Sequence, residues 1–229
     1  MLEAKNVDLH YGGSQNLHSV NLVAEPGRVT CVMGLNGTGK TSLLKAIAGR
    51  HPADGEISLA GSPVPKAARD RARAGIAYVP QGREIFAQLT VAENLETAFA
   101  CLPSDERRVL PEIYELFPVL AEMAGRRGGD LSGGQQQQLA IARALVTKPK
   151  VLLLDEPTEG IQPNIIAQIG RVIAGLRDKG SMAIVLVEQR FDFAWDLADR
   201  IVVLRRGSVL RDEERKTASR EAVLADVSV

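Results

Sequence analysis

The chain has 229 residues, 45% of them hydrophobic, and its 28 lysines and arginines balance 28 aspartates and glutamates. This length and composition suit one domain with a sizeable core and exclude a disordered or collagen-like chain. The formal charge of zero leaves no overall basic field, so we expect no nucleic-acid partner.

The sequence leads us to expect neither a membrane-spanning helix nor a signal peptide. No apolar run approaches the roughly 18 to 20 residues of a membrane-spanning helix, and the first residues lack the three parts of a signal peptide. The two cysteines, Cys31 and Cys101, have no metal-site spacing. Cys31 lies in an apolar run and is expected in the core. We therefore expect a soluble protein of a reducing compartment.

The first half of the chain predicts short strands, bounded by turn residues and then followed by helices. The strands cover residues 2–9, 19–24, 29–33, 55–61 and 75–79. A helix that ends near Ala48 follows the third of them. Thr90 and Glu93 have the spacing of a capping box for a helix through Ala100. Ser104 can cap the next helix, over residues 105–117.

The second half alternates strands with helices. Residues 151–155 and 182–188 are uninterrupted apolar runs, typical of central parallel strands covered on both faces. Residues 200–212 predict a hairpin that turns at Arg206 and Gly207, and a short helix ends the chain. We therefore expect one α/β domain over residues 1–229, with a helical subdomain inserted at about residues 83–127.

Residues 34–41, GLNGTGKT, match the phosphate-binding pattern G-x-x-x-x-G-K-[ST] at every fixed position. An apolar strand precedes them and a helix follows, a context that a chance glycine-rich turn would lack. Glycines let the loop amides surround phosphate oxygens, Lys40 adds a positive charge, and the Thr41 hydroxyl can bind Mg²⁺. The predicted nucleotide-binding residues here are Gly34, Leu35, Asn36, Gly37, Thr38, Gly39, Lys40, Thr41 and Ser42.

Two carboxylates follow the buried strand in VLLLDEPT, residues 151–158. Asp155 is suited to hold Mg²⁺, directly or through water, and Glu156 is suited to act as the catalytic base for an attacking water. A simple turn after a strand is the competing explanation for the pair.

The stretch GGDLSGGQQQQLAIARALV, residues 128–146, combines glycines, four glutamines and an apolar helical pattern. Ser132 followed by two glycines resembles a helix start with bare backbone N–H groups, which suits an anion. The glutamines therefore belong to the first helical turn and are not a disordered tract.

LSGGQ at residues 131–135, together with the motifs above, resembles the signature of ATP-binding-cassette (ABC) ATPases over essentially the whole chain. The resemblance implies a P-loop NTPase core with an antiparallel β subdomain, and hydrolysis of ATP with Mg²⁺ in a head-to-tail dimer. It also implies that the signature caps the terminal phosphate of ATP held by the partner chain. The residues concerned are Leu131, Ser132, Gly133, Gly134 and Gln135.

The family resemblance assigns three more residues. Tyr11 matches the aromatic residue that stacks on adenine, although a core tyrosine is an alternative. Gln81 matches the glutamine that contacts Mg²⁺ and the water. Gln189 stands where the family usually has a histidine that contacts the terminal phosphate. Glutamine can donate a hydrogen bond but carries no charge, so hydrolysis is expected to be slower or to depend more on Glu156. A neutral helix-start residue is the alternative for Gln189.

Residues that differ from the usual family pattern also indicate one branch of the family. VEQ at residues 187–189 resembles ATPases of branched-chain amino-acid importers, and residues 80–95 and 155–166 most resemble their urea-uptake relatives. We therefore expect a urea importer, with branched-chain amino-acid import as the alternative. The resemblance implies a second ATPase subunit (identical or different), two membrane permease subunits, indirect dependence on a periplasmic binding protein, and a place on the inner face of the cytoplasmic membrane.

Two other functions compete with transport. Soluble cassettes that act on DNA or ribosomes usually have two cassettes, a long coiled-coil insertion or basic patches, which this chain lacks. A nucleotide-gated interaction module with little turnover would fit the missing histidine.

Overall fold

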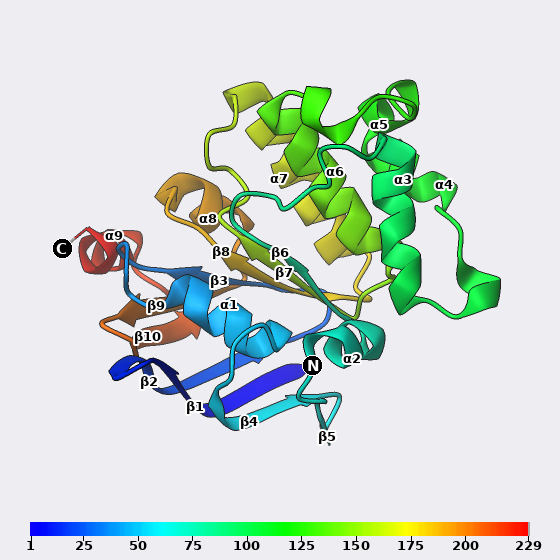
Figure 1. Ribbon diagram of the computed structural model, residues 1–229. Coiled ribbons are helices and arrows are strands. Elements are labelled where there is room, and N and C mark those ends of the chain that lie inside the picture. The colour runs from blue at the N-terminus through cyan, green and yellow to red at the C-terminus, as the bar shows by residue number, and fades with distance from the viewer. Residues whose placement is uncertain (229) are drawn as a thin grey trace.

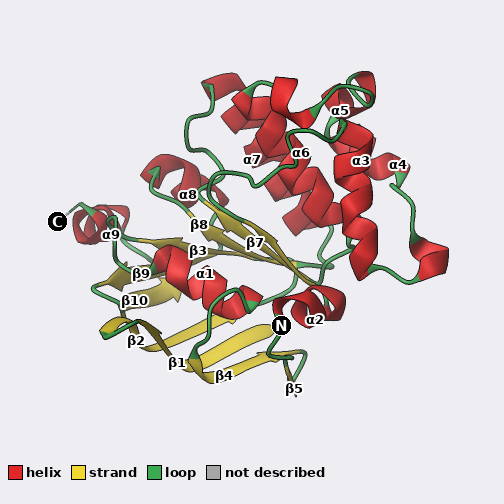
Figure 2. Ribbon diagram, viewed as in Figure 1, coloured by secondary structure: helices red, strands yellow, loops and turns green. Residues whose placement is uncertain are grey.

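The computed structural model describes residues 1–228, and two β-sheets dominate it (Figures 1 and 2). The six-stranded central sheet contains, in spatial order, β10 (Ser208–Glu214), β9 (Arg200–Arg205), β3 (Val29–Met33), β8 (Ala183–Val187), β7 (Val151–Asp155) and β6 (Ile76–Val79). The four-stranded antiparallel sheet contains β2 (Ser14–Ala24), β1 (Leu2–Tyr11), β4 (Asp54–Leu59) and β5 (Ser62–Pro63).

The α-helices lie between the two sheets, over the outer face of the central sheet and at one end of the molecule (Figure 1). They are α1 (Lys40–Ala48), α2 (Ala68–Ala74), α3 (Val91–Glu96), α4 (Pro111–Leu116), α5 (Pro118–Glu122), α6 (Gly133–Val146), α7 (Pro163–Asp178), α8 (Phe191–Leu197) and α9 (Arg220–Val227). In residues 1–228 no helix is long and apolar enough to cross a membrane.

The central sheet confirms the predicted parallel strands. β9, β3, β8, β7 and β6 are parallel neighbours, and only the edge strand β10 runs antiparallel. Every residue of β3, β7 and β8 is buried. Because parallel strands end at the same edge, the loops that follow β3, β8, β7 and β6 converge there.

Both faces of the central sheet are packed, which explains its unbroken apolar strands. Cys31 and Met33 face a core that includes residues of α6, α7 and α8. Val32, between them, faces the core formed with α1 and the antiparallel sheet. Cys31 is thus a core residue, as predicted.

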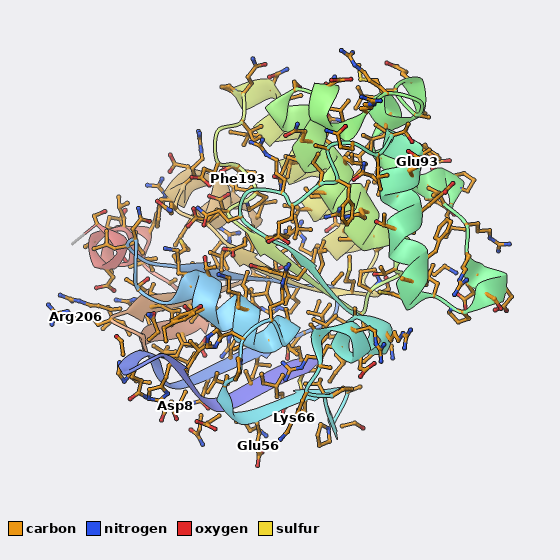
Figure 3. The ribbon with its side chains drawn as sticks, in the orientation of Figure 1. Asp8, Glu56, Lys66, Glu93, Phe193 and Arg206 are labelled. Atoms are coloured by element: carbon orange, nitrogen blue, oxygen red, sulfur yellow. The ribbon has the colours of Figure 1, made fainter. Side chains whose placement is uncertain are left out.

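The predicted hairpin near the end of the chain is confirmed. Arg206 and Gly207 connect β9 and β10 with φ angles of 48° and 79°, the left-handed pair that a two-residue type I′ turn requires. Arg206 extends away from the ribbon at this turn (Figure 3).

The helical middle of the chain partly corrects the prediction. Glu93, which Figure 3 labels on α3, forms the predicted capping box with Thr90. However, α3 ends at Glu96, and a 3-10 segment continues to Cys101. The single helix predicted over residues 105–117 is wrong. A 3-10 turn, Ser104–Glu106, and α4 replace it. Leu110 is extended, at φ −74° and ψ 146°, because a residue that precedes proline disfavours the helical region.

Helices α3, α4 and α5 fall within residues 83–127 and lie at the end of the molecule away from the antiparallel sheet (Figure 1). Helix α6, which follows this segment, packs against both α3 and β6. The proposed inserted subdomain therefore contacts the core through α6.

Candidate nucleotide-binding and hydrolysis site

A cleft of about 610 Å³ lies where the carboxyl ends of the parallel strands converge. Most of its lining residues come from the segments that follow β3, β7, β8 and β6, and one comes from β2. They are Asn16, Gln81 and members of the segments 36–42, 156–160 and 188–190.

The predicted phosphate-binding loop forms one wall of this cleft. Its Gly37 and Gly39 have φ angles of 78° and 102°, which favour glycine. A Cβ atom on Gly39 would lie 2.7 Å from Leu17 Cδ2, whereas one on Gly37 would meet nothing within 4 Å. The loop therefore leaves room for a ligand beside Gly37. Asn36, Gly37, Gly39, Lys40, Thr41 and Ser42 line the cleft, and Gly34, Leu35 and Thr38 complete the loop.

Lys40 begins α1 and is only 4% exposed. Its ammonium donates hydrogen bonds of 2.8 Å to the carbonyl oxygens of both Gly34 and Leu35, and it lies 4.0 Å from Glu156 Oε1. Burial lowers the pKa of Lys40, and the nearby carboxylates Glu156 and Asp155 oppose that effect. The carbonyl oxygens of the loop thus hold a buried cation at the cleft.

Asp155 ends β7, and hydroxyl groups from two other elements hold its carboxylate. Thr41 donates to Oδ1 at 3.0 Å, and Tyr78 of β6 donates to Oδ2 at 2.9 Å. Burial raises the pKa of Asp155, while these two hydrogen bonds act to lower it. A carboxylate beside a hydroxyl supplies the oxygen ligands that Mg²⁺ prefers, so the predicted pair fits that ion.

Tyr78→Phe should destabilise the protein by about 1 to 3 kcal/mol, because it leaves one oxygen of a buried carboxylate without its donor. Denaturant unfolding measures this change. Tyr114→Phe is the matched control, since the Tyr114 hydroxyl makes no hydrogen bond to the protein within residues 1–228. Equal unfolding midpoints for the two variants would contradict the proposed support of Asp155.

Glu156 is the point where three of the converging loops meet. Gln189, after β8, donates from Nε2 to Glu156 Oε1 at 2.7 Å. Gln81, after β6, donates from Nε2 to Glu156 Oε2 at 3.3 Å and to Glu159 Oε2 at 3.0 Å. The backbone of Glu156 itself is left-handed, with φ 47°. Gln189 thus lines the cleft beside Glu156, and it precedes Arg190, which occupies the N-cap position of α8 without a side-chain capping hydrogen bond.

The predicted signature forms a helix start outside this cleft. The Ser132 hydroxyl accepts from the Gln135 amide at 3.4 Å, and Gln135 Oε1 accepts from the Ser132 amide at 2.9 Å. The helix α6 begins at Gly133 and contains all four glutamines, so they are not a disordered tract. Leu131 is buried and Ser132 is exposed, while Gly133, Gly134 and Gln135 are half-buried. None of these five residues lines the cleft of its own chain.

Comparison with known proteins decides the family. The sequence profile described as ABC transporter matches residues 17–159. The chain belongs to the ATP-binding subunits of ABC transporters. It is therefore an ABC ATPase, and its fold is that of an ABC cassette.

Two curated relatives of this ABC ATPase cover nearly its full length. The high-affinity branched-chain amino acid transport ATP-binding protein BraG of Pseudomonas aeruginosa is 42% identical over 213 residues, which are 92% of this chain and 91% of that protein. A probable branched-chain amino acid transport ATP-binding protein of Archaeoglobus fulgidus, LivF, is 36% identical over 212 residues, 91% of this chain and 90% of that protein.

Solved structures match the whole cassette. One, the ATP-binding subunit of an ABC transporter, has a TM-score of 0.85 at 25% identity, with 100% of both chains covered. Another, a dimeric bacterial ABC transporter cassette, has a TM-score of 0.83 at 28% identity, covering 94% of this chain and 99% of that one.

Tyr11 of this ABC ATPase is not among the residues that line the cleft. It ends β1, its side chain is 40% exposed, and its ring centre is 4.4 Å from that of His51. Tyr11 is therefore not a core residue. It does not line the cleft, so its predicted contact with adenine stays a prediction.

Sequence reasoning missed Glu188, a 2% exposed carboxylate directly after β8. It accepts hydrogen bonds from the backbone amides of Thr158, Gln189 and Arg190, at 3.1, 3.0 and 3.2 Å. Burial raises its pKa. Glu188 ties the loop that carries Glu156 to the loop that carries Gln189. Its sequence signal was a single acidic residue that ends an apolar strand.

Proposed function

We propose that this ABC ATPase hydrolyses ATP in the cleft beside Lys40 and thereby powers the import of branched-chain amino acids. The observation that carries the reaction is the arrangement around Glu156, whose carboxylate lies 4.0 Å from Lys40 and is held by Gln81 and Gln189. A carboxylate fixed beside a phosphate-binding lysine suits a base that accepts a proton from an attacking water.

We assign the binding roles from the positions of these residues together with the family resemblance. The loop amides and Lys40 would hold the phosphates, and Thr41, Asp155 and Gln81 would supply the oxygen ligands of Mg²⁺. Bound Mg²⁺ would neutralise negative charge on the phosphates. Gln189 orients Glu156, and Tyr11 stacks on adenine.

A second cassette completes the site. Ser132 is exposed at the start of α6, outside the cleft of its own chain. Such a start suits an anion, so we assign the signature to ATP on another chain. The dimeric state of one solved relative supports this arrangement. The second chain is identical or is a different ATPase subunit of the same transporter.

Two permease subunits hold the cassette at the inner face of the cytoplasmic membrane, and a periplasmic binding protein delivers the cargo. A groove of about 420 Å³ between α2, β6 and α6, lined in part by Arg50 and Arg143, is the proposed seat of the permease. It adjoins the helical subdomain, where family members contact their membrane partner.

The cargo is proposed from the relatives, because no residue of the ATPase cleft contacts the transported molecule. Two relatives at 42% and 36% identity are named for branched-chain amino acid transport. Urea is the second candidate, supported by the resemblance of residues 80–95 and 155–166 to urea-uptake ATPases.

Uptake of labelled leucine and labelled urea tests the proposal in cells that lack this chain. Leucine uptake should be lost and restored by the unaltered chain, but not by Lys40→Ala, which removes the cation buried at the phosphate loop. Loss of urea uptake alone would identify urea as the cargo and would leave the proposed mechanism unchanged. Unchanged uptake of both would contradict a role in their transport.

A further inference from the structure

The cleft contains few positive charges for a site that binds a triphosphate. The cationic side chains among its lining residues are Lys40 and Arg190, against the carboxylates of Glu156, Glu159 and Glu188. Gln189, which stands where related ATPases usually have a histidine, adds no charge. Arg190 therefore carries one of the two positive charges among the residues that line the cleft.

Arg190 is free to meet a ligand. It is exposed, and within residues 1–228 its guanidinium makes no hydrogen bond and no ion pair. Arg83, close to the same cleft, differs, since its guanidinium donates to Gln136 Oε1 and to the carbonyl of Glu159.

The backbone of Arg190 is nevertheless fixed. Its amide and that of Gln189 both donate to Glu188 Oε2, at 3.2 and 3.0 Å. The other oxygen of Glu188 accepts from the amide of Thr158, two residues after Glu156. One buried carboxylate thus sets the position of Arg190 relative to the loop that carries Glu156.

We propose that Arg190 binds the terminal phosphate of the ATP held by its own chain and supplies the positive charge that Gln189 lacks. The inference rests on the proposed function of the cleft. Gln189 then orients Glu156 through its 2.7 Å hydrogen bond, while Arg190 contacts the phosphate. Gln189 and Arg190 together thus perform the functions that a single histidine performs in related ATPases.

A guanidinium suits this role because it stays protonated and can donate two parallel hydrogen bonds to phosphate oxygens. A histidine in the same place would change charge between about pH 5 and 8. The contact is made only to the terminal phosphate, so it distinguishes ATP from ADP.

Nucleotide affinity tests the inference without relying on turnover. Fluorescent ATP and ADP analogues are titrated with Mg²⁺ into chains that carry Glu156→Gln to stop hydrolysis. Adding Arg190→Ala should weaken ATP binding about tenfold, the effect of losing one charged hydrogen-bonding contact, and leave ADP binding unchanged. Arg190→Lys should restore part of the ATP affinity. Because the Arg190 amide remains in each variant, its bond to Glu188 is kept.

Arg171→Ala is the matched control, since Arg171 is an exposed arginine on α7, outside the cleft. It should bind both nucleotides like the unaltered chain. Equal ATP affinity with and without the Arg190 side chain, or an equal loss for ATP and ADP, would overturn the inference. Failure of the proposed cleft itself would look different, because Lys40→Ala would then bind ATP as well as the unaltered chain does.

Discussion

Glu156→Gln should lower ATP hydrolysis by about two to four orders of magnitude, the usual contribution of a general base. Glutamine keeps the size of the side chain and an oxygen that can accept from Gln189, but it cannot take a proton from water. ATP binding should persist, because Lys40 and the phosphate-binding loop are unchanged. The measurement is the steady rate of phosphate release, alongside nucleotide titration.

The same variant should accumulate as a closed dimer, because bound ATP is no longer removed. Light scattering with and without Mg-ATP detects this, and the second ATPase subunit is included in a parallel sample. Hydrolysis that persists above about a tenth of the normal rate would assign proton transfer to another group. Steady turnover by the unaltered chain, lost in this variant, also excludes a nucleotide-gated module with little turnover.

Ser132→Arg should abolish hydrolysis while leaving ATP binding by a single chain intact. The large cation fills the exposed helix start that is proposed to meet the phosphate held by another chain. It does not touch the cleft of its own chain, because Ser132 lies outside that cleft. Phosphate release and nucleotide affinity of the isolated chain separate the two effects.

Ser219→Arg is the control for the fold. Ser219 caps α9 as Ser132 caps α6, and loss of such a cap costs about 1 kcal/mol. Both variants therefore lose a cap, but only Ser132→Arg should stop hydrolysis. If Ser132→Arg lowered the ATP affinity of the isolated chain, this would refute the proposal that Ser132 contacts ATP held by another chain.

Local sequence patterns predicted the elements whose geometry is itself local. The phosphate-binding loop has fixed glycine positions, the hairpin turn at Arg206 and Gly207 needs left-handed residues, and the capping box of Ser132 and Gln135 spans one turn. Unbroken apolar runs likewise predicted β7 and β8. The break before Pro111 was also a local signal, because proline constrains Leu110, but the apolar spacing of residues 105–117 obscured it.

The rest of the site depends on strand order, which short patterns do not contain. Tyr78 reaches Asp155 because β6 pairs with β7 in parallel register. Glu188 reaches Thr158 because β8 is the other neighbour of β7. These contacts join residues 77 and 30 positions apart in the sequence. Arg190 stands out only when its missing partners and its place in the cleft are seen together.

The central claim is that the site that holds ATP at Lys40 of one chain is completed by the signature, residues 131–135, of another chain. Mixing Lys40→Ala with Ser132→Arg tests it most directly, under conditions in which the unaltered chain alone hydrolyses ATP. Each variant alone should be inactive, and the mixture should recover about a quarter of the normal rate, because half of randomly paired dimers contain one complete site of two. A mixture as inactive as its components would contradict a site shared between chains.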